Sequence, residues 1–190
     1  LGSLNTLVDG RWITIQHKLK PGVNGVYRSG YAPEPAIFDL SRQQISLQTV
    51  LGNVQFNDWT LLIRRNSTVE TIGKANWSRY TIGEDGMYIT NVFEGIDAEL
   101  KVFRGAIKTN FIIKRNAFGS FDELIFRDAF NGGQNTRLQF TEGNEQKGVG
   151  QLTVLLNGAD ALKVNAGYAY AKNGGKESMM AVAYDISDGV

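Results

Sequence analysis

The 190-residue sequence contains no cysteine and only one histidine, His17. These counts exclude a thiol nucleophile, a metal site built from cysteine ligands and any site that needs two histidines. The sequence also has almost no excess of one charge. Its 20 lysine and arginine residues are balanced by 19 aspartate and glutamate residues, which gives a net charge of +1. We therefore expect no cofactor, and neither nucleic acid nor an anionic membrane as a partner held by bulk charge.

Long apolar runs are absent as well, so the sequence predicts no membrane-spanning helix, which needs about 18 consecutive apolar residues. The chain begins without methionine and without the basic and apolar regions of a signal peptide. Its last alternating run ends at Ile186 and is followed by the turn dipeptide Asp188-Gly189. We interpret the chain as a segment of a longer polypeptide.

Proline is rare, with three residues, whereas glycine is abundant, with 22. Turn dipeptides such as Asp9-Gly10 and Asn24-Gly25 separate short runs in which apolar and polar residues alternate. This period of two is typical of half-buried strands and is clearest at 13–19 and 96–103. Further strands are expected at residues 45–51, 60–64, 87–92, 109–114, 123–127, 136–140, 152–156, 161–165, 168–171 and 179–185.

About a dozen short strands predict an all-β fold, an antiparallel β-sandwich with the option of two stacked modules. The best helix candidate is short, at residues 39–44. Composition changes at 131–134, which we interpret as a loop, and at 143–150, which we interpret as a boundary. We expect a sandwich domain over residues 1–145. Residues 146–190 then form further strands of the same domain or begin a second β module.

Few residues suit catalysis. His17 falls on the apolar side of its alternating run and could act as a general base, but no Gly-x-Ser-x-Gly motif supplies a nucleophile, which favours a structural role. Asp97 and Glu99 share one strand face and could serve glycoside hydrolysis or bind calcium. A solvated strand face is the simpler interpretation. We therefore predict a protein that is not an enzyme, with no catalytic or metal-binding residue.

Aromatic residues offer candidates for stacking on sugar rings, although aromatic rings more often fill a core. Trp77 and Tyr80 are the preferred pair for carbohydrate binding, because a polar loop precedes them and Arg79 lies between them. The other aromatic candidates are Trp12, Trp59, Tyr27, Tyr31 and Tyr88.

Two cationic pairs, Arg64-Arg65 and Lys114-Arg115, each close an expected strand. They could contact phosphate. With a balanced net charge, protection of strand ends against edge-to-edge aggregation is the favoured interpretation.

The segment Tyr88–Asp97, which contains Phe93-Glu94-Gly95-Ile96-Asp97, is followed by a strand and by Gly105–Ile113. This pattern resembles the N-terminal β-sandwich modules of large secreted bacterial surface proteins and adhesins. The composition is also similar to that of β-domains in tailed-phage virions. The resemblance implies a structural or adhesive role with no catalytic site to transfer.

Together these features predict a non-enzymatic structural or adhesive β-sandwich segment of a larger surface-displayed assembly. The expected location is extracellular, on a cell surface or in a virion, without membrane insertion. The expected partners are other subunits or neighbouring domains, with a surface glycan as a further candidate. The alternatives are a carbohydrate-binding module and a polysaccharide-active enzyme that uses His17 or the Asp97 and Glu99 face.

Overall fold

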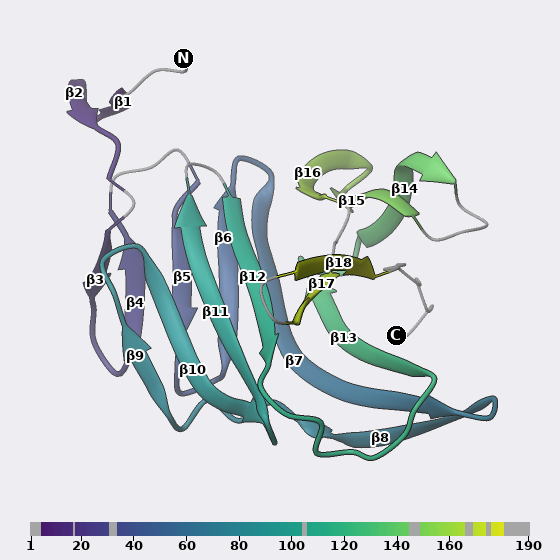
Figure 1. Ribbon diagram of the computed structural model, residues 1–190. Helices are drawn as coiled ribbons and strands as arrows, with labels where there is room; N and C mark the ends of the chain where they lie inside the picture. Colours follow the sequence, from purple (N-terminus) through teal and green to yellow (C-terminus); the bar gives the residue numbers. More distant parts are fainter. Residues whose placement is uncertain are drawn as a thin grey trace. The chain divides into compact units, whose positions relative to one another are not determined.

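The computed structural model describes residues 5–16, 18–30, 34–103, 106–144, 149–165, 169–173 and 176–180. By its contacts the chain divides into two units, residues 1–131 and 132–190 (Figure 1). Within the described residues there is no helix, and every strand pair is antiparallel. The predicted all-β, antiparallel β-sandwich class is confirmed.

The first unit contains a seven-stranded sheet in the order β13-β7-β6-β5-β4-β3, with β8 also paired to β7. Its strands are β3 (Leu19–Pro21), β4 (Val26–Ser29), β5 (Ala36–Asp39), β6 (Gln44–Thr49), β7 (Gly52–Arg65), β8 (Thr68–Lys74) and β13 (Glu123–Asn131). A four-stranded sheet has the order β12-β11-β10-β9. Its strands are β9 (Tyr80–Ile82), β10 (Gly86–Phe93), β11 (Ile96–Phe103) and β12 (Ala106–Ile113).

The core of this unit lies between the two sheets. Alternate residues of β11, Ile96, Ala98 and Leu100, have no exposed surface, as the period of two in the sequence requires. Contact between the sheets is visible at Phe111 of β12 and Phe126 of β13, whose rings stack 4.1 Å apart. Each fully buried aliphatic side chain stabilises the sandwich by about 1.5–3 kcal/mol.

The loop between β8 and β9 carries the chain from one sheet to the other. The Ala75 amide donates to the Trp59 carbonyl of β7, and the Asn76 amide donates to the Val92 carbonyl of β10, both at 2.8 Å. These two bonds fix the loop to both sheets. They thereby set the position of the next residue, Trp77.

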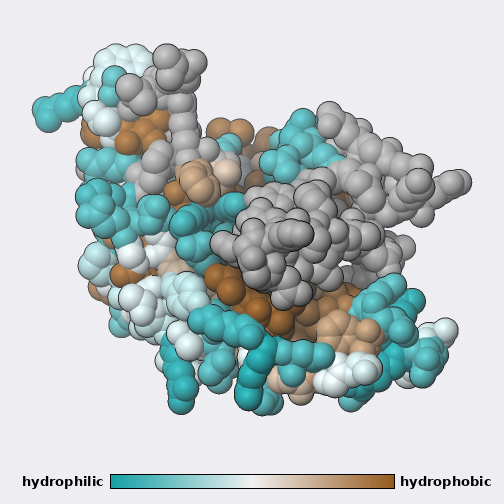
Figure 2. Space-filling view, viewed as in Figure 1, coloured by the Kyte–Doolittle hydropathy of each residue, from teal (hydrophilic) through white to brown (hydrophobic). Residues whose placement is uncertain are grey.

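Several apolar side chains of this unit remain outside the core. The hairpin of β1 (Asn5–Val8) and β2 (Arg11–Thr14) forms a sheet of its own, in which Leu7 lies directly opposite Trp12. Their exposed fractions are 57% and 72%. Figure 2 shows further apolar side chains gathered over β12 and β13, with hydrophilic side chains bordering them. An isolated two-stranded hairpin is marginally stable in water, so this arm gains from any surface that covers it.

The second unit contains a three-stranded sheet of β14 (Thr136–Asn144), β15 (Val149–Leu156) and β16 (Ala159–Val164). It also contains the pair β17 (Ala169–Asn173) and β18 (Lys176–Met180). The division after Asn131 differs from the expected boundary between residues 145 and 146. The reason is that β14 and β15 form one hairpin across that boundary, with Asn144 opposite Val149.

The prediction of a helix at residues 39–44 is wrong. Asp39 ends β5, Gln44 begins β6, and the residues between them form the turn that joins the two strands. The Asp39 carboxylate accepts bonds from the Ser41 hydroxyl (2.7 Å) and the Arg42 amide (3.1 Å). Gln43 then adopts a positive φ of 51°, which a helix does not allow. The last expected strand, 179–185, lies outside the described residues beyond Met180.

Candidate functional site

The candidate site is a groove in the first unit, formed by the β3–β4 turn, the β5–β6 turn and the loop before β9, which lie together at its lower end in Figure 1. One hollow of about 350 Å³ is lined by Asn24, Gly25, Leu40, Ser41, Gln43, Asn76, Trp77, Ser78 and Tyr80. A second, of about 220 Å³, is lined by Arg42, Gln43, Trp59, Lys74, Ala75 and Trp77. Because Gln43 and Trp77 line both hollows, we name the whole feature the Trp77 groove.

The groove brings together the predicted pair, Trp77 and Tyr80, but the two residues lie in it differently. Trp77 is only 4% exposed, and its ring packs 5.2 Å from that of Trp59. The Trp59 indole N–H in turn donates to the Asp128 carboxylate at 2.7 Å. Tyr80 is 42% exposed. Trp77 therefore forms part of the wall and the core, and Tyr80 offers the accessible ring.

Besides Leu40, Trp59 and Ala75, the rest of the lining comes mainly from polar residues, which the sequence did not indicate. Asn24 and Gly25 form a turn with positive φ at both positions, which is the turn predicted from the dipeptide. Ser41 and Gln43 come from the turn that was expected to be helical. No aspartate, glutamate or histidine is among the described residues that line either hollow. The groove therefore offers hydrogen bonds and a ring face for binding, with no carboxylate or imidazole for proton transfer.

Asp97 lies on the outer face of the four-stranded sheet, as predicted, but it is not solvated. Its side chain is 2% exposed and accepts bonds from the Tyr88 hydroxyl (2.5 Å) and the Asn91 amide (2.8 Å). Its Oδ2 also lies 2.6 Å from the Lys114 ammonium. Desolvation by burial acts to raise the pKa of Asp97, but the hydrogen bonds outweigh it and lower this pKa. The carboxylate is therefore ionised and fully engaged in the fold.

Asp97 supports an irregularity in β10. The register with β11 shifts between Ile89 and Phe93, and Asn91 has a positive φ of 51° there. The bulged amide points to the Asp97 carboxylate, which supplies the acceptor that the strand ladder does not. This gives Asp97 a structural role that no sequence pattern indicated.

Glu99, the second candidate carboxylate, is held by Asn110 at 2.9 Å and by Lys101 at 3.2 Å. The hydrogen bond from Asn110 is the main cause of a lowered pKa for Glu99. A general acid near neutral pH needs a raised pKa, so neither Glu99 nor Asp97 is suited to that role. The other catalytic candidate, His17, lies outside the described residues, as does Tyr31.

The four cations at strand ends all have carboxylate partners. The ion pairs are Arg64–Glu123 (2.9 Å), Arg65–Glu70 (2.6 Å), Lys114–Asp97 (2.6 Å) and Arg115–Glu94 (2.9 Å). These pairs join neighbouring strands and turns, which agrees with a role at strand ends better than with phosphate contact.

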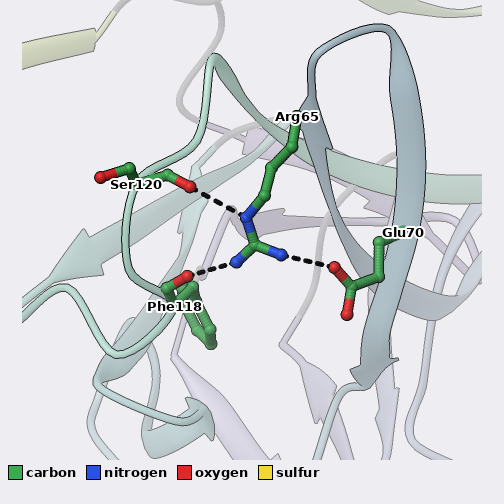
Figure 3. Close-up of polar contacts among 4 residues, drawn as sticks. All are labelled: Arg65, Glu70, Phe118 and Ser120. Atoms are coloured by element: carbon green, nitrogen blue, oxygen red, sulfur yellow. Dashed lines mark hydrogen bonds and ion pairs between the residues drawn. The ribbon is translucent and has the colours of Figure 1, made fainter.

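Arg65 has the largest set of contacts among these cations (Figure 3). Besides Glu70, its guanidinium donates to the Ser120 carbonyl at 2.9 Å and to the Phe118 carbonyl. Ser120 and Phe118 belong to the connection between β12 and β13, which joins the two sheets. Arg65 therefore fixes this connection to the β7–β8 hairpin.

Comparison with protein-family models, with curated proteins and with solved structures finds no match to the chain. In the described part of the chain, no helix has the length and apolar character to cross a membrane. The same residues contain no group of three or more histidine, cysteine, aspartate or glutamate side chains placed to hold a metal ion.

Proposed function

We propose that the chain is a non-enzymatic structural or adhesive module of a larger surface-displayed assembly, in a virion or on a bacterial envelope. The observation that carries this proposal is the apolar surface left at the edges of the first unit. It comprises the Leu7 and Trp12 pair of the hairpin arm together with Phe103, Ile112 and Ile113 of β11 and β12.

The arrangement of charge supports the same function. The carboxylates and cations that the sequence offered as candidates, Asp97, Glu99 and the strand-end pairs, are paired with neighbouring side chains of the same unit. In contrast, β12 is the last strand of its sheet, so one row of its backbone groups can pair with a strand of a neighbour. A stable interface of this kind buries about 1,000 Å² or more.

The test measures association of the purified chain, alone and with the other subunits of its native assembly, by sedimentation velocity. We expect Trp12→Ser and Ile113→Lys each to weaken association by about tenfold. Val50→Ser is the matched control, because Val50 is 93% exposed at the β6–β7 turn and lies outside both patches. A chain whose association is unaffected by both edge variants would contradict the proposal.

A second candidate function, carbohydrate binding, is supported by the Trp77 groove. Its amide and hydroxyl side chains match the hydroxyl groups of a sugar, and the accessible ring of Tyr80 matches the apolar C–H face. Affinity electrophoresis in gels that contain polysaccharide tests this function. Retention should fall in Tyr80→Ala and persist in Phe103→Ala, an exposed aromatic outside the groove. No retention on any polysaccharide would remove the candidate.

A further inference from the structure

The two hollows of the Trp77 groove differ in charge, and this difference indicates a class of ligand. We propose that the groove binds an anionic oligosaccharide, with a neutral sugar at Tyr80 and a carboxylate or sulfate group at Arg42. The inference rests on the carbohydrate-binding function proposed above and specifies its ligand.

The neutral half of the groove lies around Tyr80. Asn24, Asn76, Ser41 and Ser78 line it. The Ser41 hydroxyl already donates to Asp39, and Asn76 Oδ1 accepts from the Ser78 amide, which leaves the Ser41 oxygen as an acceptor and the Asn76 amide N–H groups as donors. Amides and hydroxyls both donate and accept hydrogen bonds, as the hydroxyl groups of a sugar do. A pyranose whose C–H face lies on the Tyr80 ring would present its hydroxyls to these groups.

The charged half of the groove contains Arg42 and Lys74. The Arg42 side chain is 76% exposed, and its Nε forms an ion pair with the Asp39 carboxylate at 3.7 Å, a separation too long for a hydrogen bond. Asp39 already accepts bonds from the Ser41 hydroxyl and the Arg42 amide. The guanidinium fork of Arg42 therefore remains able to donate two parallel bonds to a carboxylate or sulfate.

The two halves adjoin each other, because Gln43 and Trp77 line both. The walls are fixed before any ligand arrives. Trp77 packs on Trp59, and the hydrogen bonds of Asp39 hold the turn that carries Arg42. A preorganised site loses less conformational freedom on binding, which favours measurable affinity for a short oligosaccharide.

The experiment measures binding of the full 190-residue chain to three probes by isothermal titration calorimetry: oligomers of galacturonic acid, sulfated glucose oligomers and neutral glucose oligomers. The variants are Tyr80→Ala, Arg42→Gln and Gln43→Asn, the last of which shortens a shared lining residue and tolerates its positive φ. Arg127→Gln, which removes one exposed cation from β13, is the control for charge.

We expect an anionic probe to bind more tightly than the neutral one, with an affinity that falls as salt is added. Arg42→Gln should reduce the anionic affinity about tenfold and leave the neutral affinity within twofold, whereas Arg127→Gln changes neither. Tyr80→Ala and Gln43→Asn should weaken all binding. Equal affinities for neutral and anionic probes, with no effect of Arg42→Gln, would overturn the inference and leave carbohydrate binding standing. Absence of binding to every probe would overturn both.

Discussion

Replacement of Asp97 by alanine is the most direct test of how the four-stranded sheet is held together. The bulged Asn91 amide would lose its acceptor, and an unsatisfied buried N–H costs about 1–3 kcal/mol. Lys114 is 57% exposed and can turn to water, so its lost ion pair adds less than about 1 kcal/mol. The half-buried Tyr88 hydroxyl also loses a partner. We expect Asp97→Ala to lower the free energy of unfolding by about 3 kcal/mol.

The Asp97→Asn variant separates the hydrogen bond from the charge. The asparagine oxygen can still accept from the Asn91 amide, so the expected loss is smaller, about 1–1.5 kcal/mol. Glu99→Gln is the matched control on the same face, where the carboxylate is 29% exposed and contacts Lys101 and Asn110. Its expected loss is below about 1 kcal/mol.

The pH dependence has a definite sign. Because the folded pKa of Asp97 is lowered, its contribution is complete above the unfolded value of about 3.9 and is lost as pH falls through the folded pKa. The stability difference between the wild type and Asp97→Asn should therefore narrow below about pH 4. Urea unfolding followed by tryptophan fluorescence reports on the first unit, which contains all three tryptophans. A cost of Asp97→Ala below about 0.5 kcal/mol at pH 7 would refute this account of the bulge.

Three further substitutions test the packing of the same unit. Gly86→Ala places a Cβ 2.0 Å from the Leu100 carbonyl oxygen, so we expect the free energy of unfolding in urea to fall by about 2–3 kcal/mol. In the control Gly73→Ala the new Cβ meets no atom within 4 Å, and the expected loss is below about 1 kcal/mol. Arg65→Gln should remove the hydrogen bonds that hold the β12–β13 connection, so we expect faster amide hydrogen exchange at residues 116–122. Unchanged exchange at these residues would contradict the contacts of Figure 3. Trp59→Phe removes the indole bond to Asp128 and should cost about 2 kcal/mol by the same unfolding assay, with a cost near zero as the contrary result.

The all-β class was predictable because period two and glycine turns are local signals. Alternation at 96–103 corresponds directly to β11, and Asn24-Gly25 forms the turn that its residue types predict. The turn at 39–44 was not recognised, because its decisive features are the Asp39 hydrogen bonds and the positive φ of Gln43. The six residues contain neither glycine nor proline, so the sequence indicates neither these hydrogen bonds nor the positive φ.

The candidate site was predicted only in part for a related reason. Trp77 and Tyr80 do meet at one groove, but Trp77, which lies in a loop, is buried against Trp59 of β7, eighteen positions earlier in sequence. The ion-pair partner of Asp97 is likewise distant in sequence, because Lys114 lies directly after β12. The alternation of apolar and polar residues within one β-strand indicates on which face of the sheet a residue lies. It does not indicate which residues of other strands or loops pack against that face.

The placement of polar groups in the first unit connects its two proposed functions. On the outer face of β11, Asp97 is paired with Lys114 and Glu99 with Lys101, so these carboxylates offer little free polarity to a ligand. At the turns, Ser41, Arg42 and Gln43 project from a segment whose backbone is already fixed by Asp39. Loops on a rigid scaffold are the usual place for recognition. The proposed assembly surface lies at the edge strands and the proposed glycan site lies at the turns, so the two proposed functions use different surfaces of the unit and are compatible with each other.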